Sequence, residues 1–164
     1  MDSVLTKVKQ KCIIFIYHKI FRGFLVMTRK IARENTFLLL FEGACKNDET
    51  PEEIFNKAVE IRDLEVDEFV KSVFFGTYAN IQIIDEMIER NIKGWKKERI
   101  SPVSLAVLRL ASYEMLFVED IPAKVSINEA VELCKKYDDE KAYSFVNGVL
   151  HKISTETSSD NAEQ

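Results

Sequence analysis

A chain of 164 residues can bury one hydrophobic core, so a single domain is expected. Three prolines and five glycines are too few for the many tight turns of an all-β fold, which favours a helical protein. The net charge is −4. The three cysteines are odd in number and widely separated, which excludes a disulfide framework and a CxxC metal site and fits a reducing cytoplasm.

The charge is distributed unevenly along the chain. Residues 1–33 carry eight Lys and Arg side chains and one Asp, a net charge of +7, so the remainder of the −4 chain carries −11. A basic arm ahead of an acidic body is typical of proteins that bind a polyanion. A solvated tail without a partner is the alternative.

Residues 1–26 mix basic and apolar side chains. Lys19 and Arg22 interrupt the apolar residues, so no run approaches the roughly 20 residues that span a bilayer. The apolar segment 12–17 is short for a signal peptide, and no small-x-small cleavage site follows it. We expect neither membrane insertion nor secretion, and interpret 1–26 as an extension or as a start codon assigned too far upstream.

Helical periodicity begins at Met27. Apolar residues on one helical face predict a helix that fades near Cys45, and residues 50–53 combine a capping box with a first-turn proline that opens a short second helix. An apolar stripe over residues 66–88 steps by three and four and predicts one long helix. Gly76 within this stripe predicts a close contact with another helix.

The second half of the chain predicts three more helices. Ser101 and Pro102 are an N-cap and a first-turn proline, and the helix that follows is apolar on nearly all sides, so it should be central. Residues 126–129 form a second capping box. A last helix carries apolar residues up to Ile153, whereas the polar residues 154–164 predict a disordered tail.

Residues that carry catalysis are scarce. His18 and His151 are the two histidines, both expected at the surface, and no P-loop, GxGxxG, HExxH or GxSxG motif is present. We expect no enzyme, no cofactor and no metal. Aromatic rings beside basic residues suggest RNA instead, because unpaired bases stack on rings while Lys and Arg meet phosphates. Such groups occur at 135–137, at 143–145 and around Trp95, although core packing is the alternative for Phe145.

Several segments in order resemble the NusB family. Residues 29–34 (R-K-I-A-R-E) resemble its R-x-x-A-R-E helix, and residues 103–113 (V-S-L-A-V-L-R-L-A-S-Y), 126–133 (S-I-N-E-A-V-E-L) and 145–150 (F-V-N-G-V-L) follow with the spacing of its C-terminal half. The resemblance covers about residues 27–153. It implies an all-α, compact bundle of about six or seven helices in two small helical subbundles.

The resemblance also implies a role in transcription antitermination. NusB proteins bind the single-stranded boxA element of nascent RNA, notably in ribosomal RNA leaders, together with NusE, a small-subunit ribosomal protein. The pair helps RNA polymerase to pass terminators. We therefore expect a cytoplasmic RNA-binding protein with these partners and no membrane contact, and keep a homodimer as an alternative to the monomer.

Site residues are carried over from the family by position. Arg29, Lys30 and Arg33 match the arginine-rich start and would contact phosphates. Lys124 and Phe145 match positions near RNA, the first for backbone charge and the second for a base.

The contact with NusE is carried over in the same way. Phe41 and Ser104 match positions at the NusE surface. This sequence departs from the family there: Phe41 stands where a tyrosine is common, Leu38 where a glutamine is common, and Ser104 where a glutamate can occur.

Two other functions remain open. The same helical domain resembles the RNA-binding front of some ribosomal RNA cytosine methyltransferases, which would make this chain a stand-alone RNA-binding domain without catalysis. A purely structural interaction bundle with an accidental basic arm is the other alternative, and salt-dependent RNA binding would distinguish it.

Overall fold

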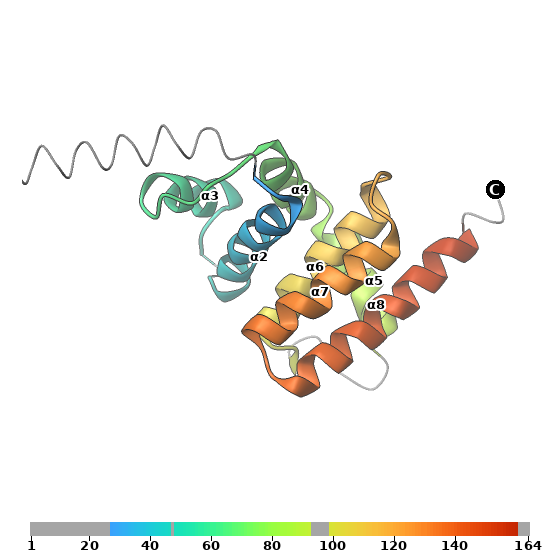
Figure 1. Ribbon diagram of the computed structural model, residues 1–164. Coiled ribbons are helices and arrows are strands. Elements are labelled where there is room, and N and C mark those ends of the chain that lie inside the picture. Colours follow the sequence, from blue (N-terminus) through green and yellow to red (C-terminus); the bar gives the residue numbers. More distant parts are fainter. Residues whose placement is uncertain (1–26, 47, 93–98, 161–164) are drawn as a thin grey trace, which may run out of the picture.

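The computed structural model describes residues 27–46, 48–92 and 99–160, which form seven helices and no strand (Figure 1). The all-α prediction is therefore confirmed. The predicted extension 1–26 and the basic group around Trp95 lie outside the described residues. The helices are α2 (Arg29–Cys45), α3 (Pro51–Glu60), α4 (Glu68–Ala79), α5 (Ile81–Asn91), α6 (Pro102–Phe117), α7 (Ala123–Tyr137) and α8 (Glu140–Asp160).

Side-chain caps start several of these helices where the sequence predicted them. The Thr50 hydroxyl accepts a hydrogen bond from the backbone amide of Glu53, and the Glu53 carboxylate accepts one from the backbone amide of Thr50. These two bonds form the predicted capping box of α3. Ser101 caps α6 through the Ser104 amide. The capping box predicted at residues 126–129 is wrong, because α7 begins at Ala123 behind Pro122, and Ser126 lies inside the helix.

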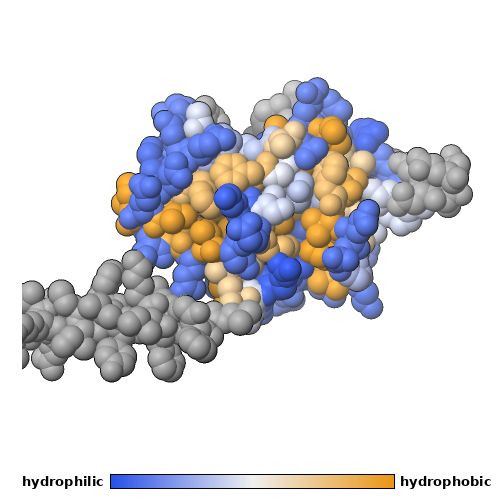
Figure 2. Space-filling view, turned by 90° about the horizontal axis from the view of Figure 1, so that it is seen from above, coloured by the Kyte–Doolittle hydropathy of each residue, from blue (hydrophilic) through white to orange (hydrophobic). Residues whose placement is uncertain are grey.

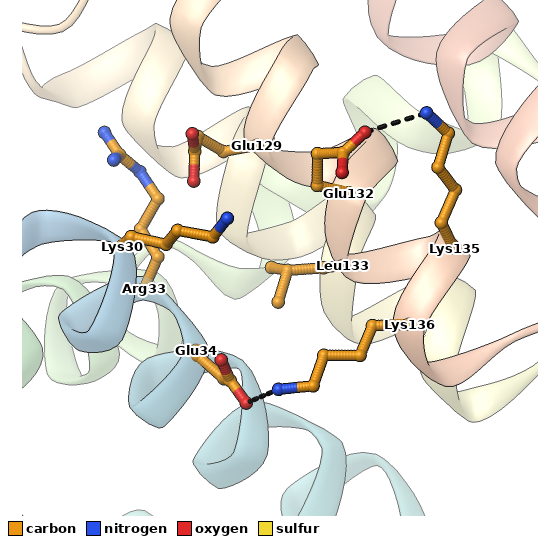
Figure 3. A pocket seen from close by; sticks show the side chains of 8 residues that line it. All are labelled: Lys30, Arg33, Glu34, Glu129, Glu132, Leu133, Lys135 and Lys136. Atoms are coloured by element: carbon orange, nitrogen blue, oxygen red, sulfur yellow. Dashed lines mark hydrogen bonds and ion pairs between the residues drawn. The ribbon is translucent and has the colours of Figure 1, made fainter.

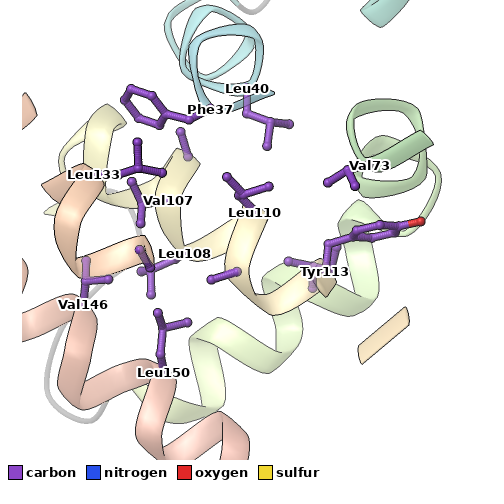
Figure 4. Close-up of a cluster of buried hydrophobic side chains, with 14 of the residues drawn as sticks. Phe37, Leu40, Val73, Val107, Leu108, Leu110, Tyr113, Leu133, Val146 and Leu150 are labelled. Carbon is purple, nitrogen blue, oxygen red and sulfur yellow. The ribbon is translucent and has the colours of Figure 1, made fainter. Parts of the chain in front are cut away.

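Helix α6 is the centre of the fold. It contacts α2 and α4 on one side and α5, α7 and α8 on the other, so it joins two groups of helices (Figure 1). Its predicted central position is confirmed, and Figure 4 shows its side chains between those of α2, α4, α7 and α8. The helix contributes many buried residues to this core, including Ala106, Val107, Leu108, Leu110 and Ala111. None of the described helices combines the length and hydropathy of a membrane span.

The single long helix predicted over residues 66–88 is wrong. The chain bends at Asn80, whose φ of −114° and ψ of 18° separate α4 from α5. The Asn80 amide donates to the carbonyls of Gly76 (3.1 Å) and Thr77 (3.3 Å), and its side-chain amide donates to Gly76 (2.8 Å). The apolar spacing continues across the bend because α4 and α5 both pack on α6.

The close helix contact predicted at Gly76 is confirmed. A Cβ atom at this position would lie 2.0 Å from Oη and 2.4 Å from Cζ of Tyr113 on α6. Because Tyr113 is only 9% exposed, its ring has little room to move. We expect Gly76→Ala to lower the free energy of unfolding by about 1–3 kcal/mol in urea denaturation, the usual cost of overpacking.

Gly148 on α8 provides the matched control for Gly76→Ala. No atom lies within 4 Å of a Cβ built there, so Gly148→Ala should gain roughly 0.5–1 kcal/mol from helix propensity alone. Equal stability of the two variants would contradict the steric argument.

The disordered tail predicted from residue 154 is wrong for residues 154–160, which continue α8. This part of the helix is bound to α5. The Asn91 side-chain amide donates to Glu156 (2.8 Å), and Arg90 forms an ion pair with the same carboxylate (3.1 Å). Polar contacts with a neighbouring helix, which composition alone does not reveal, therefore order a segment with few apolar residues. Residues 161–164 lie outside the described part.

Candidate nucleic-acid interface

A pocket of about 340 Å³ lies between the start of α2 and the outer face of α7 (Figure 3). Spacings of three and four residues place its charged α7 side chains on one helical face. We call this site the α2–α7 pocket. It is lined by Lys30, Arg33 and Glu34 of α2 and by Glu129, Glu132, Leu133, Lys135 and Lys136 of α7.

Two lysines of the α2–α7 pocket are held by carboxylates. Lys136 donates to Glu34, which also accepts from the Tyr137 hydroxyl, and Lys135 lies 2.8 Å from Glu132. The hydrogen bond from Lys136 is the largest cause that lowers the pKa of Glu34, and the same bond raises the pKa of Lys136. Such exposed pairs are worth about 0–1 kcal/mol, so an incoming phosphate can replace the carboxylate at little cost.

Two cations at the start of α2 remain available to a ligand. Lys30 is exposed, and no hydrogen bond or ion pair joins its ammonium to any described residue. Arg29 is also exposed, with its guanidinium carbon 4.3 Å from the centroid of the Phe69 ring of α4. This cation–π contact orients the guanidinium on an exposed surface, where its N–H groups can meet a phosphate.

Arg33 does not have the predicted role of a phosphate contact, because it is 6% exposed and paired inside the protein. Its Nε donates to Oε1 of Glu114 (2.8 Å), and the Ser126 hydroxyl donates to Oε2 of the same carboxylate (2.7 Å). Glu114 is 1% exposed. These three side chains connect α2, α6 and α7, so Arg33 stabilises the packing of the three helices.

A second pocket of about 450 Å³ lies between α7 and α8. It shares Glu132 and Lys135 with the α2–α7 pocket, so the two form one continuous surface. We call it the α7–α8 pocket. The Lys135 ammonium lies 5.7 Å from the centroid of the Tyr143 ring, which is the kind of aromatic and cationic pair that unpaired bases stack on. Its other lining residues are Asn128, Val131, Ser144 and Asn147.

The other predicted RNA contacts lie beside these pockets. Phe145 is half-buried and packs against the core on α8, next to the Tyr143 and Ser144 side chains that line the α7–α8 pocket. Lys124 is exposed in the first turn of α7 and lines neither of the two pockets. Of the predicted RNA contacts, the pocket lining thus contains Lys30 and the internally paired Arg33.

The residues predicted to contact NusE differ in accessibility. Phe41 is half-buried on α2, with its ring centroid 6.1 Å from that of Phe37. Ser104 is 2% exposed, and its hydroxyl donates to Asp138 (3.0 Å) beside the hydroxyl of Ser101 (2.6 Å). The burial of Ser104 contradicts the predicted partner contact, because its side chain points inward and its hydroxyl donates to Asp138, the residue that follows α7.

Large apolar side chains also reach the surface. Figure 2 shows apolar patches between polar regions on the face seen from above. The most exposed of these residues in the described part of the chain belong to different elements, so no one helix presents a continuous apolar outer face. They are Ile31, Ile61, Ile83, Phe117 and Val125.

Groups suited to bond chemistry are few. Burial, and then the nearby Asp138 carboxylate, raise the pKa of the Cys134 thiol to about 12, so it stays protonated at neutral pH. Within the described ranges, no group of three or more His, Cys, Asp or Glu side chains is placed to hold a metal ion.

Comparison with known sequences gives one consistent relationship. The model of the NusB family matches residues 30–155. The transcription antitermination protein NusB of Clostridium perfringens (strain SM101 / Type A) is 44% identical over 131 residues, covering 77% of this chain and 96% of the relative. NusB of Clostridium botulinum (strain Kyoto / Type A2) is 41% identical over 143 residues, covering 77% and 99%.

Solved structures agree with the sequence relatives. T. maritima NusB superposes with a TM-score of 0.72 at 35% identity and covers 80% of this chain and 94% of its own. A crystal structure of the antitermination factors NusB and NusE in complex with double-stranded RNA gives 0.69 at 33% identity, with 77% and 96% covered. The chain therefore belongs to the NusB family, whose members are transcription antitermination factors, and it is not an enzyme.

Proposed function

We propose that this antitermination factor binds boxA-type single-stranded RNA in nascent ribosomal transcripts together with NusE. The observation that carries the proposal is the continuous surface of the two pockets, with Lys30 at one end and Tyr143 at the other. Arg29 precedes Lys30 in the first turn of α2 and is exposed. Cations for phosphates and a ring for bases are the groups that single-stranded RNA needs.

The RNA backbone would follow the cations of this surface. Arg29 and Lys30 contact phosphates directly, and Lys135 and Lys136 exchange their carboxylate partners for phosphates. Lys124 adds charge beside the surface. Phe145 supports the base-binding face of α8 from its partly buried position.

The NusE contact rests on a relative. A NusB with 33% identity to this chain has been crystallised with NusE and double-stranded RNA, which supports an assembly of this chain with NusE and RNA. We propose that the accessible part of Phe41 takes part in the contact, and leave Ser104 out because it is buried. The complex of RNA, NusE and this protein would then act on RNA polymerase in the cytoplasm.

A binding titration tests the proposal. Fluorescently labelled boxA RNA, a scrambled RNA of the same composition and a boxA duplex are titrated with the full chain, with and without NusE. We expect the tightest binding for single-stranded boxA, and a further gain with NusE. Equal binding of boxA and scrambled RNA in the presence of NusE would overturn the proposal.

A further inference from the structure

Glu129 differs from the other carboxylates of the α2–α7 pocket. Glu34 and Glu132 are held by lysines, whereas no hydrogen bond or ion pair joins Glu129 to another described residue. The side chain is half-buried, and Figure 3 shows its carboxylate directed into the pocket, on the same side as the Lys30 ammonium. An unpaired carboxylate repels phosphates, so binding of the RNA backbone does not explain why Glu129 lines this pocket.

A carboxylate in an RNA-binding pocket is an acceptor for the donors of a base edge. Guanine presents two adjacent donors, N1–H and the N2 amino group, which match the two oxygens of one carboxylate. Cytosine and adenine present a single amino group on this edge. Uracil flanks its one N–H with two carbonyl oxygens, which a carboxylate repels. Guanine is therefore the base that this group selects.

The rest of the pocket suits a single unpaired base. Its volume of about 340 Å³ lies at the lower end of the range of roughly 300–1,000 Å³ that pockets for small molecules have. Leu133, which is 7% exposed, gives the lining an apolar side chain for the base. Lys30 and Lys136 from the two facing helices can hold the adjoining phosphates.

We propose that Glu129 determines specificity by accepting hydrogen bonds from N1–H and the N2 amino group of an unpaired guanine in the α2–α7 pocket. The proposal rests on the proposed RNA-binding function and adds to it the base that is selected and the residue that selects it. Backbone contacts position the strand without reading sequence, whereas this contact reads a base edge.

The test compares single bases in an otherwise constant strand. Oligouridine dodecamers with one central guanosine, inosine, adenosine or uridine are titrated against the full chain and against Glu129→Gln. A good bidentate contact discriminates by about 5- to 150-fold, so the wild type should bind the guanosine strand that much more tightly than the uridine strand. Inosine, which lacks the N2 amino group, should fall between them, and Glu129→Gln should lose most of the preference.

Glu132→Gln is the matched control, because Glu132 lines the same pocket but is paired with Lys135. It should change the affinity for all four strands alike and keep the preference for guanosine. Salt-dependent binding of all four strands with equal affinity by the wild type would overturn the inference and leave the proposed function standing. An unchanged preference in Glu129→Gln would overturn it as well, and absence of RNA binding would remove both.

Discussion

Replacing Arg33 by methionine is expected to lower the free energy of unfolding by about 3–5 kcal/mol. The substitution leaves the Glu114 carboxylate, which is 1% exposed, without the guanidinium that lies 2.8 Å from it. Among the described residues, Ser126 is then the one that still donates a hydrogen bond to that carboxylate, and a hydroxyl does not neutralise its charge. Urea denaturation followed by circular dichroism measures the loss.

Two further variants separate charge burial from loss of RNA contact. The double variant Arg33→Met with Glu114→Leu removes both charges and should recover much of the lost stability, because an apolar pair of similar volume can replace a buried ion pair. Lys30→Met, at an exposed position of the same helix, should stay within about 0.5 kcal/mol of the wild type. An Arg33→Met protein of unchanged stability would show that the ion pair does not hold α2, α6 and α7 together.

Removing the two exposed cations at the start of α2, Arg29 and Lys30, should weaken RNA binding strongly. If Arg29 and Lys30 each neutralise one phosphate, the variant Arg29→Gln with Lys30→Gln lowers the salt slope by about 1.4, at about 0.7 per phosphate of a single strand. This decrease in the slope corresponds to an affinity about 25-fold lower than that of the wild type at 0.1 M salt. Titrations of single-stranded boxA RNA at four salt concentrations measure both quantities.

The control for this variant removes the same amount of charge elsewhere. Lys46 and Lys57 lie at the other end of α2 and on α3, where they pair with Glu49. Lys46→Gln with Lys57→Gln should leave the slope and the affinity close to those of the wild type. Equal weakening in both double variants would mean that net charge, rather than a surface at the start of α2, governs binding.

Helix starts could be predicted from sequence because their causes are local. Thr50 with Glu53 and Ser101 with Pro102 carry their capping chemistry within four residues. The bend at Asn80 could not be predicted from the sequence. Both α4 and α5 bury apolar residues against α6, so the helical spacing of apolar residues continues across the bend. The ordered end of α8 depends on α5, which is distant in sequence.

The candidate site was predictable only in part. Arg29, Lys30 and Arg33 look equivalent in the sequence, and the partner that distinguishes Arg33 is Glu114, 81 residues away. The polar face of α7 that includes Glu129 and Lys135 is visible as a helical spacing. That α2 lies opposite this face of α7 depends on how the helices pack, which helical spacing does not reveal. The sequence therefore pointed to the lysines beside Tyr137 but not to the pocket that they line.

The proposed function requires the RNA to lie on the surface formed by α2, α7 and α8. Amide hydrogen exchange of the full chain, measured with and without single-stranded boxA RNA, locates it directly. We predict added protection in the first two turns of α2, along residues 128–136 of α7 and at residues 143–147 of α8. Protection confined to other helices, such as α3 and α5, would contradict the assignment of the RNA-binding surface.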